Sequence, residues 1–287
     1  MARVAIPGGV WSDGAQQASA PLRELTLRPI SGEDELFLLD TADHAAPSER
    51  ATALLARCLG DTGRAVDAHA LTVGDREALL LQLRRLTLGE TVDCVLHCPA
   101  VGCGERMDLE LRVADLLVPA YADVRRSYEL TADLDDARYD VSFRLPTALD
   151  LDAVAPMARV DLERAANALL ARCVVGATRD GTSVDLDALT PAVRASIAAA
   201  MAEHDPQAEI ELELTCPVCG GASAVVFDTA TFLLQELDAR ANRLMHEVHT
   251  LAWHYHWSER DILRIPWRRR ARYLEMVADS AARARTR

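Results

Sequence analysis

The 287-residue chain contains no lysine, so all 31 of its basic side chains are arginines. Its 44 acidic residues give a net charge of −13, which disfavours broad binding to nucleic acid. No apolar run approaches the roughly 20 residues of a membrane-spanning helix. The N-terminal residues MARVAIPGGVWSDG lack the apolar stretch of a secretory signal. These absences predict a cytoplasmic protein with no membrane segment and no nucleic-acid partner.

Signatures of catalysis are also missing. The sequence has no glycine-rich phosphate loop and no Gly-x-Ser-x-Gly elbow. The acidic run at 133–136 lacks the glycine and the distal glutamate of a calcium loop. His246 and His249 share one predicted helix face, but no nearby carboxylate pair completes a metal site, so a polar helix face is the simpler interpretation. The sequence therefore does not predict an enzyme.

Seven cysteines are present, and four of them lie in two similar loops. Cys98 and Cys103 lie in CPAVGCG, and Cys216 and Cys219 lie in CPVCGG. Each loop is flanked by strand-like runs, so each is predicted to be a hairpin tip that presents two thiolates. Four thiolates complete a closed tetrahedral zinc site, with no position left for a reacting water. The sequence thus predicts one structural Zn²⁺ per chain on these four cysteines.

Other interpretations of the loops stay open at this stage. Each loop could hold a pair of thiols, or the loops could have lost the metal. A Cys-x-x-Cys redox site normally begins a helix after a strand. A glycine turn and a second strand follow Cys219 instead, which argues against redox chemistry. An odd number of cysteines with metal-type spacing suggests a reducing compartment.

The long separation of the loops is explained by an internal repeat. ALLARCLG at 53–60 recurs as ALLARCVVG at 168–176, which places Cys58 and Cys173 115 residues apart. Other markers keep nearly the same offset: Asp34 with Asp150, Leu71 with Leu189, Cys98 with Cys216, and Cys103 with Cys219. Shared order and spacing predict two copies of one helix-plus-hairpin unit, each supplying half of a zinc site. Cys58, Cys94 and Cys173 are then expected to be buried and unligated.

The chain is expected to divide into five segments. These are a flexible N-terminal arm (1–20), a first unit with the first cysteine knuckle (21–125), an acidic connector (126–137), a second unit with the second knuckle (138–235), and a C-terminal helical docking module (236–287). Helices are predicted at 33–40, at 48–59 and from Thr72 to Gly89, and a polar turn at 177–185. Strands and helices mix without a βαβ rhythm, so the predicted class is α+β, with a shared zinc-ribbon-like site.

The last fifty residues differ in character from the rest. Apolar residues at 237, 241, 244, 248, 251 and 255 predict one long amphipathic helix. From Trp257 onward nine arginines face four acids, a local charge of +5 on a chain that is otherwise −18. This basic tail could clamp onto the acidic body, reach an acidic partner, or be a solvated face. Five aromatic residues are expected to crowd together there: Trp253, Tyr255, Trp257, Trp267 and Tyr273.

A motif in the C-terminal segment resembles a known family. It consists of His249, Leu251, Ala252, Tyr255, Trp257, Ser258, Asp261, Ile262, Ile265, Pro266, Arg270, Tyr273 and Leu274. The stretch 249–277 is similar to the end of a family of baseplate (hub or assembly) proteins of contractile phage tails and phage-tail-like contractile injection systems. The resemblance implies a structural or assembly role, contacts with other baseplate and tail proteins, possible incorporation into the assembled particle, and no catalysed reaction.

The rival class is a zinc-ribbon nucleic-acid-binding or transcription accessory protein. Such ribbons carry basic or aromatic residues around their knuckles. The loops here hold apolar, uncharged residues, including Val101 and Val218, which favours contact with protein. A zinc enzyme is disfavoured by the closed ligand set. The basic tail is expected to dock onto other subunits, so deleting 258–287 should leave a folded, zinc-holding chain that does not join its assembly.

Overall fold

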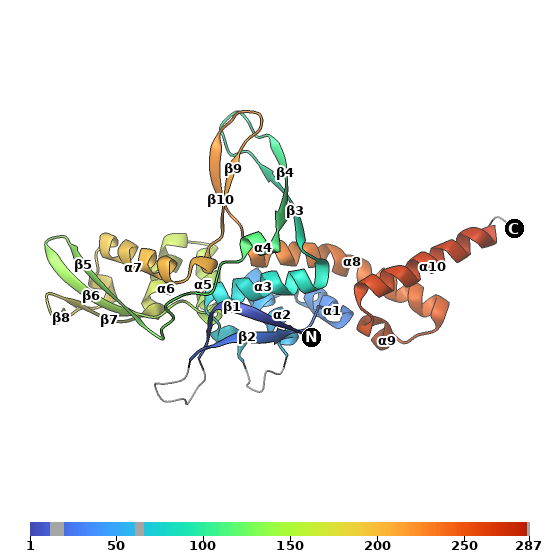
Figure 1. Ribbon diagram of the computed structural model, residues 1–287, viewed down its shortest axis with the longest axis horizontal. Coiled ribbons are helices and arrows are strands. Elements are labelled where there is room, and N and C mark those ends of the chain that lie inside the picture. Colours follow the sequence, from blue (N-terminus) through green and yellow to red (C-terminus); the bar gives the residue numbers. More distant parts are fainter. Residues whose placement is uncertain (12–19, 61–65, 286–287) are drawn as a thin grey trace.

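The computed structural model describes residues 1–11, 20–60 and 66–285. Figure 1 shows an elongated molecule. A sheet with two helices lies at one end, two long hairpins project from the middle, and a pair of helices lies at the other end. Strand pairing is antiparallel throughout the described sheets. Helices and separate antiparallel sheets together confirm the α+β class.

The first half of the chain begins and ends with a hairpin. Its elements are β1 (Ala2–Val10), β2 (Leu22–Leu27), α1 (Gly32–Thr41), α2 (Pro47–Cys58), η1 (Ala68–Ala70), α3 (Val73–Leu88), β3 (Thr91–His97), β4 (Arg106–Arg112) and α4 (Val113–Leu116). Thr72 caps α3 by accepting the backbone N–H of Asp75, and Gly89 ends the helix at φ 114°. The three helices expected in this half are confirmed.

The second half repeats the order of hairpin, helices and hairpin. Its elements are β5 (Tyr128–Leu134), β6 (Ala137–Phe143), α5 (Ala148–Ala158), α6 (Leu162–Cys173), β7 (Val174–Arg179), β8 (Thr182–Ser183), η2 (Leu186–Ala188), α7 (Pro191–His204), η3 (Pro206–Ala208), β9 (Glu211–Thr215) and β10 (Ala222–Val226). Strands β5, β6, β7 and β8 form one sheet in that order. The other strands form two-stranded hairpins.

Two of the expected irregular segments are strands. The prediction of a flexible arm at 1–20 is wrong for Ala2–Val10, because this segment is a strand that pairs with β2 and buries Val4 and Ile6. Residues 12–19 of that arm lie outside the described residues. The prediction of an acidic connector at 126–137 is also wrong, because Tyr128–Leu134 forms strand β5. Its alternating charges cover the exposed face, while Tyr128 is buried on the other.

The polar turn expected at 177–185 is a hairpin. Arg179 pairs with Thr182 across the two-residue turn Asp180-Gly181, where both φ angles are positive. Asp-Gly is the sequence that this tight turn favours, because both positions need left-handed backbone. The same geometry joins β5 to β6 through Asp135-Asp136. Both tight turns connect strands of the sheet formed by β5, β6, β7 and β8, which the sequence analysis did not predict.

One long helix links the body to the C-terminal end. α8 (Thr229–Tyr255) confirms the amphipathic prediction, since Leu237, Leu244 and Leu251 are fully buried. It begins before 236, and its first turns complete the core of the first half, so the expected boundary at 236 is wrong. α9 (Glu259–Arg264) and α10 (Trp267–Arg285) follow. In the part of the chain that the structure describes, no helix is long and apolar enough to cross a membrane.

Candidate metal centre

Two projecting hairpins bring the four loop cysteines together. In Figure 1 the tip of β3–β4 lies beside the tip of β9–β10, far from the helical body. Each hairpin alternates apolar and polar residues, so each has an inner apolar face. Leu96, Met107 and Leu214 pack with the cysteines beneath the tips. The inner faces therefore direct both knuckles toward one point.

The four sulfurs form one compact group. The Sγ atoms of Cys98 and Cys219 are 3.7 Å apart, and those of Cys103 and Cys216 are 3.8 Å apart. All four ligand atoms lie within 4.8 Å of one another. Cys98 and Cys216 are buried, whereas Cys219 is exposed. Each close pair joins one knuckle to the other, so an ion held there would link the two halves of the chain.

Backbone hydrogen bonds shape the turn in each cysteine loop around its sulfurs. The N–H of Cys98 donates to the carbonyl of Glu105 at 2.8 Å, and that of Cys216 donates to Gly221 at 3.0 Å. Gly220 follows Cys219 at φ 69°, a backbone conformation that favours glycine. Backbone N–H groups of Cys219 and Val218 point at the Cys216 sulfur and lower its pKa to about 7. The thiolate, which is the form that binds metal, is thereby favoured at Cys216, whereas burial and the neighbouring thiols raise the pKa values of Cys98 and Cys103.

The arrangement fits a tetrahedral zinc ion. Zn–S bonds of about 2.3 Å place the sulfurs of a tetrahedron about 3.8 Å apart. The two close sulfur pairs match that spacing. Each knuckle also donates backbone N–H groups to its sulfurs, the second-shell contacts that stabilise bound thiolates. Four thiolates leave no open coordination position, so the site can hold a structural metal but offers no place for a reacting water.

The remaining cysteines divide into two cases. Cys58 and Cys173 are completely buried, as predicted, and burial raises the pKa of each thiol. Cys94 is partly exposed, which corrects the prediction that it is buried. A groove of 410 Å³ opens between the hairpins at this level, and Cys94 lines it with Leu212. The groove is also lined by Phe232 of α8, so it lies between β3, the second hairpin and that helix.

The histidines of α8 lie on its exposed face, apart from the cysteine group. Within the described ranges, the four cysteines are the only set of three or more ligand side chains close enough to share an ion. His246 and His249 both lie on the exposed side of α8. His249 stacks against Trp253, whose side chain is 73% exposed. The helix-face interpretation of these histidines therefore holds.

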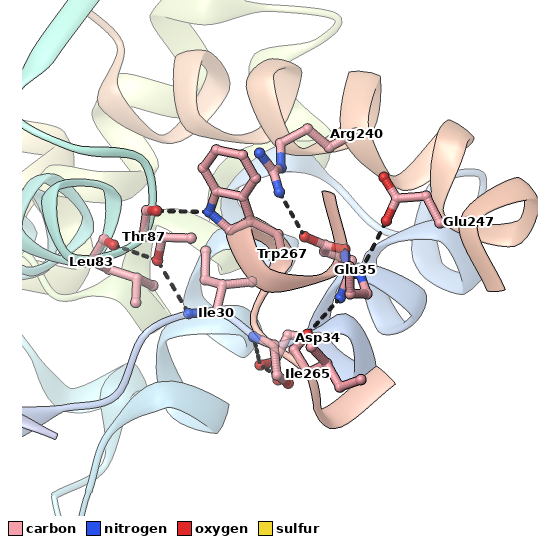
Figure 2. Close-up of polar contacts among 11 residues, drawn as sticks. Ile30, Asp34, Glu35, Leu83, Thr87, Arg240, Glu247, Ile265 and Trp267 are labelled. Carbon is pink, nitrogen blue, oxygen red and sulfur yellow. Dashed lines mark hydrogen bonds and ion pairs between the residues drawn. The ribbon is translucent and has the colours of Figure 1, made fainter. Parts of the chain in front are cut away.

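Contacts with the body fix the beginning of the basic tail. Arg270 is 1% exposed, forms an ion pair with the buried Glu35, and contacts Glu247 at 3.0 Å. Figure 2 shows Arg240 reaching Glu35 and Trp267 donating its ring N–H to the Thr87 carbonyl. These contacts join α10 to α1, α3 and α8. The sequence analysis singled out the arginines of the tail but did not predict their partners, because Glu35 lies 235 residues before Arg270 in the chain.

The expected aromatic cluster is smaller than the sequence suggested. Tyr255, Trp257 and Tyr273 pack together, with ring centroids 4.7 to 5.6 Å apart. Trp267 lies elsewhere, under the guanidinium of Arg240 at 4.1 Å. Trp253 faces outward. Helical periodicity explains the split, since Trp253 lies on the face of α8 opposite to its buried stripe.

Comparison with known proteins gives one result. A family model described as T4 bacteriophage base plate protein matches residues 14–234. No curated protein and no solved structure is significantly similar to the chain. The match covers most of the chain, including both hairpins, and ends shortly after α8 begins.

Proposed function

Because the chain belongs to the family of the T4 bacteriophage base plate protein, we propose that it is a zinc-binding structural or assembly component of a contractile phage-tail-like injection apparatus. It acts through contacts with other baseplate and tail proteins and catalyses no reaction. It is made in the cytoplasm and joins the particle there. The family match supports the baseplate role, and the closed ligand set supports a purely structural metal.

The observation that carries the zinc proposal is the spacing of the sulfurs. Cys98, Cys103, Cys216 and Cys219 come from loops more than a hundred residues apart, yet their Sγ atoms lie within 4.8 Å of one another. A packing preference for small apolar residues does not require four thiols at one point. A tetrahedral ion does. Zinc would tie the tips of two otherwise separate hairpins into one rigid, zinc-ribbon-like projection.

Matching ion-pair networks support the internal duplication. Arg28 contacts Asp34 at 2.6 Å, and Arg57 contacts the same carboxylate at 2.9 Å. In the second half, Asp150 receives Arg144 at 2.5 Å and Arg172 at 2.9 Å. Both aspartates also accept the N–H of the residue three before them. We assign the two copies to residues 2–112 and 128–226, each running from one hairpin to the next.

The charge on the hairpins supports protein partners over nucleic acid. Exposed acids cover their outer faces: Asp93, Asp108, Glu110, Glu211 and Glu213. Phosphates would be repelled by this surface. The tips are apolar, with Val101 fully exposed and Val218 67% exposed. An apolar tip on an acidic stem suits an apolar pocket with a basic surround on another tail protein.

Metal analysis tests the proposal directly. Protein purified without chelator should contain one zinc per chain, and Cys98→Ser and Cys216→Ser should each lose it. Cys58→Ser is the control, because Cys58 is buried in another core and its loss should leave the zinc content unchanged. Co-expression of the parent chain with tail proteins of the same assembly should yield a complex that contains both. Absence of zinc would refute the metal site, and failure to recover any tail protein would refute the assembly role.

A further inference from the structure

The four loop cysteines form two close pairs of thiols, and each pair joins one hairpin to the other. The Sγ atoms of Cys98 and Cys219 lie 3.7 Å apart, and those of Cys103 and Cys216 lie 3.8 Å apart. The sulfurs of a disulfide are about 2 Å apart, so each pair has to approach by roughly 2 Å to form one. The fold therefore places these thiols where they can bond across the hairpins.

Solvent reaches one sulfur of each pair and not the other. Cys219 is exposed and Cys103 is partly exposed, whereas Cys98 and Cys216 are buried. Oxidation of a cysteine depends on its access to solvent, and a second thiol beside it converts the first product into a disulfide. Each pair thus offers an accessible thiol to an oxidant and a buried thiol to complete the bond.

The length of chain between the partners also favours bonds across the hairpins. Cys98 and Cys219 are 121 residues apart, and Cys103 and Cys216 are 113 apart. A disulfide stabilises the folded chain by constraining the unfolded one, and its effect grows with the length of the loop that it closes. A bond within one cysteine loop would close only a few residues. The Cys-x-x-Cys exchange that the sequence argues against uses the pair within one loop, so it is a different reaction.

We propose that these cysteines form a peroxide-reactive thiol site, at which oxidation replaces the metal link between the hairpins by the disulfides Cys98–Cys219 and Cys103–Cys216. The inference rests on the zinc site proposed above and adds a second chemical state of the same four residues. Thiols stay reduced in the cytoplasm and form disulfides in oxidising surroundings. A particle that leaves the cell would keep its hairpins joined after the metal is lost.

Hydrogen peroxide is the oxidant, and each disulfide consumes one molecule of it. The Cys219 thiol attacks one peroxide oxygen, the O–O bond breaks, and a sulfenic acid and one water form. The Cys98 sulfur then attacks the Cys219 sulfur. An S–S bond forms, the S–O bond breaks, and the departing oxygen leaves as a second water with the proton of the Cys98 thiol. Two electrons pass from sulfur to oxygen. Cys103 and Cys216 react in the same way, and the chain then offers no thiolate to the ion.

Peptide mapping identifies the pairs, because trypsin cuts this lysine-free chain only after arginine. The first two cysteines, Cys98 and Cys103, lie in the peptide 86–106, and the last two, Cys216 and Cys219, lie in the peptide 195–240. Zinc-loaded protein in a small excess of hydrogen peroxide should release its zinc, measured with a chromogenic chelator. Its digest should contain the two peptides joined until a reductant separates them. Bonds within the loops would leave the peptides separate, each lighter by two hydrogens.

Two single variants check the assignment of the pairs. Cys219→Ala should still join the two peptides through Cys103 and Cys216, and should leave Cys98 as a free thiol. Cys94→Ala is the matched control, because Cys94 lies in the same peptide as Cys98 but belongs to neither pair. Its zinc release and its joined peptides should match those of the parent chain.

Peptides that separate without reductant overturn the proposal, and so does a chain that keeps its zinc and its free thiols in the peroxide. Joining that is lost in Cys94→Ala also overturns it. Zinc content before oxidation tests the metal site, and co-expression tests the assembly role. A chain that holds zinc and joins its partners, but forms disulfides within its loops, refutes this inference alone.

Discussion

Asp75 and Asp205 are two carboxylates that the fold buries beside Gly74. Asp75 accepts the backbone N–H groups of Gly8 and Gly9 at 2.8 Å. Asp205 accepts the N–H of Gly74 at 2.9 Å and the hydroxyl of Tyr121 at 2.7 Å. Neither has an arginine partner in these bonds. Burial raises the pKa of both, and that of Asp205 rises to about 6.

The raised pKa of Asp205 predicts a pH dependence with a definite sign. The folded chain holds this proton up to about pH 6, whereas the unfolded chain loses it near the ordinary value of 3.8. The free energy of unfolding should therefore fall by roughly 1 to 3 kcal/mol as pH rises from about 4 to 6. Asp205→Asn keeps an acceptor for Gly74 and removes the ionisation, so its slope in that window should be smaller.

Urea unfolding of the parent chain and Asp205→Asn across that range measures the effect. The difference between the two proteins cancels the pH dependence of metal binding, which both share. Asp34→Asn is the control, since arginine contacts lower the pKa of Asp34 to about 2 and move its titration below the window. Equal slopes for the parent chain and Asp205→Asn would contradict the predicted pKa.

At this scale the sequence indicated residue types better than partners. A helix was expected to begin at Thr72, and Thr72 does cap it by accepting the N–H of Asp75. The Asp75 carboxylate instead bonds residues 66 and 67 positions earlier. Those partners lie in a segment that was expected to be a loose arm. A helix cap can be predicted from residue spacing alone. The hydrogen bonds of a buried carboxylate depend instead on which distant backbone segment the fold places beside it.

Among the elements, helices were better predicted than hairpins. Capping residues and apolar periodicity involve neighbours about one helical turn apart, so α3 and α8 could be predicted directly from the sequence. The pairing of strands β1, β5 and β7 is set by the fold rather than by their own composition. The clustering of the four cysteines could be predicted because similar knuckles recur on matching hairpins.

The docking of α10 predicts a large effect from one buried arginine. Arg270→Met removes the ion pair with Glu35 and leaves that carboxylate, 1% exposed, with Arg240 as its remaining cation. The free energy of unfolding should fall by roughly 3 kcal/mol, because a buried charge loses its partner. Chemical denaturation measures this. Arg264→Met is the matched control, since its pair with Glu33 is exposed and should change stability by less than about 1 kcal/mol.

An unchanged denaturation midpoint for Arg270→Met would show that the tail is not held by this contact. The same burial bears on the deletion of 258–287. Ile262 and Leu263 are buried with Leu244, and the deletion would expose that cluster and leave Glu35 without Arg270. The truncated chain should therefore be less stable than the sequence suggested, and loss of partners alone would not isolate a docking role. Point variants of the exposed part of α10 separate the two effects.

For the whole molecule, the two halves meet in the helical body, at the base of the hairpins, and at the sulfurs of the tips. In the body, α5 and η3 of the second half pack on α2 and α3, and Asp205 accepts the N–H of Gly74. At the base, Val92 and Leu212 belong to one apolar cluster with Phe232 of α8. At the tips, the apolar group is small, and half of it consists of the cysteines themselves. A two-stranded hairpin alone is marginal in water. The tips should therefore depend on the metal, whereas the base should not.

Hydrogen exchange before and after chelation tests this gradient. Removing zinc should speed exchange of amides around Leu96, Met107 and Leu214 by about tenfold or more, because these strands lose the cross-link that opposes local opening. Amides of α2 should be unaffected, since the core that it shares contains no residue of the two cysteine hairpins. Cys98→Ser should reproduce the effect without chelator. If the tips stay protected after the zinc is shown to be gone, packing rather than metal joins the hairpins, and the two halves of the chain are held together by packing in the body and at the base of the hairpins.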